Sequence, residues 1–185
     1  MTGFEDLIGK PAPSFTLPNY DGQPFEFMPG GSGLPTALLF YPQSGQHGPL
    51  NSISKQLTHP FVGSYGCTQQ ICSFRDAVIE QTTFKPENSQ VIAISPDPVE
   101  KQKEFVEKQN IPFPVLSDTE KEVPKLYGIG KGLFGFAPIA RVTFIVDKDG
   151  IIRDALDATM NYGAHQKFVD KWFQKLEGES ATTES

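Results

Sequence analysis

Two cysteines five residues apart are the residues of this chain whose type and spacing could carry chemistry. Cys67 and Cys72 lie in the segment 66–76, Gly-Cys-Thr-Gln-Gln-Ile-Cys-Ser-Phe-Arg-Asp, and no other cysteine occurs in the 185 residues. A single pair is too few for the disulfide framework of a secreted scaffold. A catalytic or metal-binding role is therefore favoured.

The position of Cys67 makes it the better nucleophile of the two. Residues 67–81 contain neither Pro nor Gly and place apolar residues on one side, which predicts a helix. The unpaired N–H groups and the positive dipole end of its first turn stabilise an anion, so they favour the thiolate of Cys67. A thiolate that attacks a peroxide becomes a sulfenic acid, which a second thiol such as Cys72 can convert to a disulfide.

A regular helix keeps the two cysteines too far apart to bond. Residues five apart have Cα atoms separated by about 8.5 Å, whereas a disulfide needs less than about 7 Å. We therefore expect the first turns of this helix to unwind on oxidation. The alternative is that both cysteines are ordinary half-buried residues. Zinc is disfavoured, because the cysteines match no usual ligand spacing with His47, His59 or His165.

The elements around the cysteines follow the order strand, helix, strand, helix, hairpin, helix. Apolar runs and turn signals predict strands at 12–17, 36–41, 91–95, 141–146 and 151–156, and helices at 67–81, 99–109 and 164–176. This order fits an α/β chain with a mixed central sheet flanked by helices, as in thioredoxin-like folds. The length predicts one domain over 1–177, with a polar insertion at 46–63 and a disordered tail at 178–185.

The net charge and the composition disfavour some classes of binding partner and some cellular locations. A net charge of -6 disfavours nucleic acid and anionic membrane as partners. No run of about 20 apolar residues is present, and the first residues lack the pattern of a secretory signal. We therefore expect a cytoplasmic protein, with the nucleus as the other compartment open to it.

The motifs resemble those of the peroxiredoxins, most closely the peroxiredoxin Q or bacterioferritin-comigratory-protein branch. The resemblance is carried by residues 9–17, 39–42, 66–68 with Cys72 and 74–76, 94–97, 112–118, 127–128 and 141–147. It implies a thioredoxin-like fold and a thiol-dependent peroxidase for hydrogen peroxide and organic hydroperoxides. It also implies recycling by thioredoxin or a similar dithiol, no metal, haem or flavin cofactor, and a monomer.

The resemblance also implies roles for five residues. Cys67 matches the peroxidatic cysteine, Cys72 the resolving cysteine of the same chain, and Arg141 the arginine that stabilises the thiolate and the departing oxygen. Ser64 takes the place of the hydroxyl that bonds the peroxide, and Pro42 that of the proline that shields the thiolate from water. A salt bridge at a strand edge is the alternative for Arg141, and an ordinary loop serine for Ser64.

The spacing of Pro42 departs from the family pattern. Pro42 lies 25 positions before Cys67, and removing the 18 residues 46–63 would bring it to the family's seven. One explanation is a short intron translated in frame, because residues 57–63 can be encoded with splice-like signals. The other is a genuine surface loop, since loops accept insertions. Transcripts that always retain these codons would refute the intron.

Two other functions fit the same cysteines. A redox sensor or thiol-disulfide relay would pass its disulfide to a client protein, and a mixed disulfide trapped with that client would distinguish it. A paralogue inactivated by the insertion would keep the fold and lose the reactivity of Cys67.

Overall fold

A five-stranded mixed sheet forms the centre of the protein. The structure is a computed structural model that describes residues 3–43, 65–80, 85, 87–132, 135–158 and 161–183. The sheet has the order β5-β4-β3-β6-β7. Its strands are β3 (Thr36–Phe40), β4 (Gln90–Ser95), β5 (Val115–Ser117), β6 (Val142–Val146) and β7 (Ile152–Asp157). β3, β4 and β5 run parallel, whereas β6 is antiparallel to both β3 and β7. The predicted mixed sheet is confirmed.

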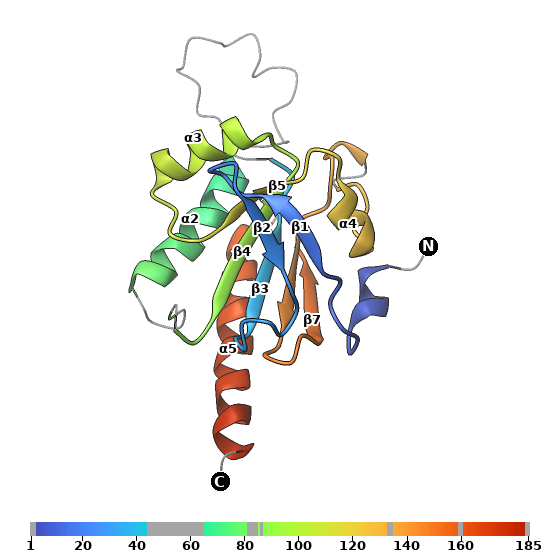
Figure 1. Cartoon of the computed structure of the whole chain (residues 1–185), viewed down its shortest axis with the longest axis vertical. Helices are drawn as coiled ribbons and strands as arrows, with labels where there is room; N and C mark the ends of the chain where they lie inside the picture. Colours follow the sequence, from blue (N-terminus) through green and yellow to red (C-terminus); the bar gives the residue numbers. More distant parts are fainter. Residues whose placement is uncertain are drawn as a thin grey trace.

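The two faces of the sheet are covered by different elements (Figure 1). One face packs against the helices α2 (Tyr65–Glu80), α3 (Val99–Gln109) and α5 (Tyr162–Thr183). The other packs against the hairpin of β1 (Phe15–Pro18) and β2 (Pro24–Phe27), the 3-10 helix η1 (Phe4–Leu7) and the helix α4 (Glu122–Leu126). Along β3, Leu39 faces the three helices and Leu38 the opposite cluster. A central strand buried on both faces reads as an unbroken apolar run.

The long elements lie where the sequence predicts them, and β1 overlaps the strand predicted at 12–17, whereas β5 and α4 were missed. α3 has the predicted bounds, and α2 begins two residues before Cys67, which places this cysteine in the first helical turn. β5 has only three residues, and α4 has five and includes Pro124. Segments this short show no periodicity, so their structure comes from tertiary packing.

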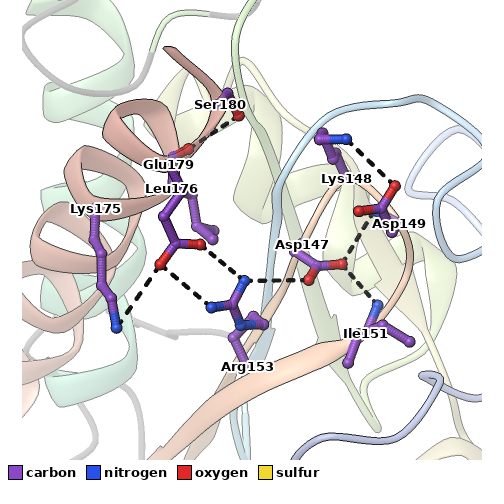
Figure 2. A network of polar contacts seen from close by, with 9 residues as sticks. All are labelled: Asp147, Lys148, Asp149, Ile151, Arg153, Lys175, Leu176, Glu179 and Ser180. Carbon is purple, nitrogen blue, oxygen red and sulfur yellow. Dashed lines mark hydrogen bonds and ion pairs between the residues drawn. The ribbon is translucent and has the colours of Figure 1, made fainter. Parts of the chain in front are cut away.

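Helix α5 continues to Thr183, where the sequence predicts a disordered tail from Gly178. The apolar pattern does end at Leu176, but polar contacts hold the later turns. Arg153 on β7 donates to the two carboxylate oxygens of Glu179 at distances of 3.1 and 3.3 Å (Figure 2). This bidentate pair holds the last part of α5 against the edge strand of the sheet. The helix therefore continues beyond Leu176, where its apolar pattern ends.

Helix α5 places a buried histidine against β6. His165 is fully buried, with Nδ1 2.9 Å from the Thr143 hydroxyl and Nε2 3.1 Å from the carbonyl oxygen of Ala158. A carbonyl can only accept, so Nε2 carries the proton and Nδ1 accepts from Thr143. Burial lowers the pKa of His165 most, the hydrogen bond to Ala158 raises it and the charge of Arg141 lowers it, so that the pKa falls from 6.5 to about 4. The side chain is therefore neutral at pH 7.

We expect this histidine to make the fold acid-sensitive. The folded pKa of about 4 lies below the unfolded value of 6.5, so its contribution is present above pH 6.5 and lost as pH falls through 4. The free energy of unfolding should fall by about 3 kcal/mol more between pH 7 and pH 4 in the wild type than in His165→Gln. Urea denaturation at the two pH values measures this difference. Equal losses in both proteins would contradict it.

Candidate active site

Cys67 occupies the buried first turn of α2. The helix begins at Tyr65, and the Cys67 side chain is fully buried among the residues between the helices and the sheet. N–H groups in the first turn have no partner within the helix, and the dipole is positive at this end. This position favours a negative charge on the sulfur.

Arg141 brings a positive charge to that sulfur. It precedes β6, where Val142 pairs with Phe40 at the end of β3, so it lies at the edge where β3 ends. Its side chain is 4% exposed, and Nη2 donates to the sulfur of Cys67 at 3.0 Å. Among the described residues, no carboxylate forms an ion pair with Arg141. A buried guanidinium needs a compensating partner, and the sulfur of Cys67 is a described group that contacts it directly.

Gln70 holds Arg141 from a second side. It lies three residues after Cys67 on the same face of α2, is fully buried, and accepts a hydrogen bond from Nη1 of Arg141 through Oε1. Its own Nε2 has no partner among the described residues, and neither do Nε of Arg141 and the Thr68 hydroxyl. These buried groups give the site spare capacity to hydrogen-bond a polar ligand.

Tyr162, the first residue of α5, contacts both Arg141 and Gly66. The guanidinium carbon of Arg141 lies 5.0 Å from the centroid of its ring. A Cβ atom added to Gly66 would lie 2.0 Å from the ring carbon Cζ of Tyr162. Only glycine therefore fits before Cys67 while the ring is in place.

Cys72 contacts the end of α3. It is half-buried, and its thiol donates to Oε1 of Gln109 at 3.4 Å. Arg75 donates to the backbone carbonyl of Gln109 at 2.9 Å, so two residues of α2 hold the end of α3. Burial raises the pKa of Cys72, the charge of Arg75 lowers it, and that of Asp76 raises it. The raised pKa disfavours the thiolate form of Cys72.

The structure describes some of the predicted site residues, whereas others lie outside the described ranges. Cys67 and Arg141 are in contact, Cys72 lies on the same helix, and Pro42 is buried two positions after β3. Ser64 and the insertion 46–63 lie outside the described residues. So do His47 and His59, and within the described ranges no group of three or more His, Cys, Asp or Glu could hold a metal ion.

Sequence reasoning missed three residues of the site. Gln70 could have been found, because its spacing of three from Cys67 on a predicted helix places both on one face. Tyr162 and Gln109 had no signal, since each reaches the site from a distant helix.

No helix in the described part of the chain has the length and apolar character to cross a membrane.

We expect Arg141→Gln to slow alkylation of Cys67 by iodoacetamide at neutral pH by about 10- to 100-fold, because a charged hydrogen bond contributes about 1.5–3 kcal/mol. Mass spectrometry of the Cys67 peptide over time measures the rate. Arg75→Gln is the matched control, since Arg75 contacts Gln109 and leaves Cys67 untouched. An unchanged rate in Arg141→Gln would show that the guanidinium does not sustain the thiolate.

Known proteins share both the sequence and the fold of this chain. A family described as AhpC/TSA matches residues 57–155. The chloroplastic peroxiredoxin Q of Sedum lineare is 32% identical over 169 residues, which cover 91% of this chain and 77% of that protein. The chloroplastic peroxiredoxin Q of Oryza sativa subsp. japonica is 34% identical over 78% of this chain, but the match spans only 56% of that longer protein.

Solved structures agree with these relatives. Peroxidoxin BcpB from Mycobacterium tuberculosis matches with a TM-score of 0.70 and 27% identity over 91% of this chain and 97% of that one. Peroxiredoxin Q from Xanthomonas campestris shares the fold, with a TM-score of 0.67 at 19% identity over 87% of this chain and 90% of that one. With a buried cysteine at a helix start, an arginine on its sulfur, and relatives above 30% identity over most of its length, the chain belongs to the AhpC/TSA family of peroxiredoxins.

Proposed function

We propose that this protein is a thiol peroxidase that reduces hydrogen peroxide and organic hydroperoxides with Cys67 and resolves the product with Cys72. The observation that carries the proposal is the 3.0 Å hydrogen bond from the buried Arg141 guanidinium to the sulfur of Cys67, at the start of α2. The peroxiredoxin Q relatives support the same reaction class.

In the first step the thiolate of Cys67 attacks one oxygen of the peroxide. A sulfur–oxygen bond forms as the oxygen–oxygen bond breaks, and the sulfur gives two electrons to the peroxide. The product is a sulfenic acid on Cys67, while the departing alkoxide or hydroxide takes up a proton and leaves as alcohol or water. Negative charge moves from sulfur to the departing oxygen, and the guanidinium of Arg141 can stabilise it throughout.

In the second step the sulfur of Cys72 attacks the sulfenic sulfur of Cys67. A disulfide forms, and the hydroxyl group leaves as water. Cys72 must first leave Gln109, and the turns of α2 between the cysteines must unwind, because a regular helix holds their Cα atoms about 8.5 Å apart. The half-buried Cys72 thiol loses its proton more readily once this region opens to water.

An external dithiol, proposed to be thioredoxin, then returns two electrons by attacking the Cys67–Cys72 disulfide. Resolution within one chain requires no second subunit, so we propose that the protein acts as a monomer. Pro42 and Ser64 complete the proposed site, Pro42 by excluding water from the sulfur and Ser64 by hydrogen-bonding the peroxide. This arrangement requires no metal or organic cofactor.

Thiol titration tests the proposal directly. One equivalent of hydrogen peroxide should remove both thiols of the reduced wild type within seconds, without a covalent dimer on non-reducing mass analysis. Cys72→Ser should instead lose one thiol and hold a sulfenic acid on Cys67, with no thioredoxin-supported turnover. Two surviving thiols in the wild type would rule out the reaction.

Unwinding of α2 should be visible in the far-ultraviolet circular dichroism. The disulfide form should lose the helical signal of about one to two turns relative to the dithiol form. Cys72→Ser treated with peroxide is the control, because it can form no internal disulfide and should keep its spectrum. If the wild-type spectrum is the same in both redox states, the two cysteines bond without unwinding.

A further inference from the structure

Tyr162 contacts two parts of the site that have different tasks. Its ring lies over the guanidinium of Arg141, 5.0 Å from ring centroid to carbon, and against the backbone of Gly66. Arg141 acts on the sulfur of Cys67, whereas Gly66 belongs to the turn that must unwind before Cys72 can reach it. One side chain of α5 therefore contacts both the guanidinium that acts on the sulfur and the helical turn that must unwind.

We propose that Tyr162 is a positioning residue that holds Arg141 on the Cys67 sulfur and keeps the first turn of α2 wound. It thereby sets how often the Cys67 sulfenic acid is resolved by Cys72 and how often it is oxidised further. This inference rests on the peroxidase function proposed above.

The contact with Arg141 restrains the guanidinium without using its hydrogen-bond donors. Nη2 and Nη1 donate to Cys67 and Gln70. An aromatic face attracts a cation and takes none of its N–H donors. The ring of Tyr162 therefore holds the guanidinium in place without competing with the sulfur for an N–H donor.

The contact with Gly66 stabilises the wound form of the helix. The ring is so close that the Cβ of any other residue would overlap it, so packing here depends on the helical position of Gly66. Unwinding moves Gly66 away and loses that contact. While the turn stays wound, Cys72 remains on Gln109, and a second peroxide can meet the sulfenic acid.

Two fates of the sulfenic acid then compete. Attack by Cys72 forms the disulfide and releases water. Attack by the sulfenate on a second hydroperoxide forms a sulfinic acid, as two further electrons pass from sulfur to the peroxide and an alcohol or water leaves. A residue that favours the wound turn shifts the outcome toward the sulfinic acid.

The test compares Tyr162→Leu with Tyr162→Phe. Tyr162→Leu removes the ring, so we expect about tenfold slower reaction of Cys67 with peroxide and with iodoacetamide. We also expect a sulfinic acid yield in excess peroxide at least threefold lower than in the wild type. Tyr162→Phe keeps the ring and should stay within twofold of the wild type in all three measurements.

Trp172→Leu is the control for general loosening of α5. The Trp172 ring lies 4.4 Å from Nζ of Lys175 and 5.8 Å from the guanidinium carbon of Arg153, and its indole donates to Asp154 at 2.9 Å. It anchors the same helix without contacting the site, so all three measurements should match the wild type.

Three outcomes would overturn the role of Tyr162. Tyr162→Leu could react at the wild-type rate with an unchanged sulfinic yield, or Trp172→Leu could reproduce its changes. Either result in a wild type that consumes both thiols would leave the proposed peroxidase standing. A wild type that keeps both thiols in peroxide would overturn the peroxidase and this inference together.

Discussion

A guanidinium buried against a sulfur is the interaction on which the rest of this structure depends. Removing a charge from water costs several kcal/mol unless nearby groups compensate for it. Arg141 is 4% exposed, and the described partners around it are the Cys67 sulfur, the Gln70 amide oxygen and the Tyr162 ring. Of these groups, the thiol is ordinarily the strongest acid. In the proposed reaction, the same contact therefore balances the buried cation and stabilises the thiolate that attacks the peroxide.

The topology of the sheet delivers that contact. β6 runs antiparallel to β3, so the residue before β6 and the residues after β3 lie at one edge, next to the start of α2. Side chains alternate between the two faces of a strand. Ile145 lies on the helix-covered face, so Arg141, four residues earlier, lies on the same face. A register slip of one residue in β6 would turn Arg141 toward the opposite core. The exact pairing of Val142 with Phe40 is therefore as necessary to the site as the arginine itself.

The sequence predicted what depends on local pattern and missed what depends on distant packing. The apolar runs of β3 and β4, the period of α3 and the place of Cys67 in a helical turn all follow from neighbouring residues. Arg141 could be assigned only through resemblance, because 74 positions separate it from Cys67. The sequence predicts a tail where the last turns of α5 lie, because the contact that holds these turns comes from Arg153 on another strand. Tyr162 gave no sign in the sequence that it would reach Gly66.

The contacts that exist only while α2 is wound also bear on the reduction potential of the cysteine pair. In the proposed reaction, the contacts of Cys72 with Gln109 and of Tyr162 with Gly66 stabilise the dithiol and would be lost in the disulfide. Whatever stabilises the dithiol alone makes the disulfide a stronger oxidant, by about 30 mV for every 1.4 kcal/mol in a two-electron couple. In the proposed cycle, the packing that restrains Cys72 would therefore make the disulfide easier to reduce, because reduction restores these contacts.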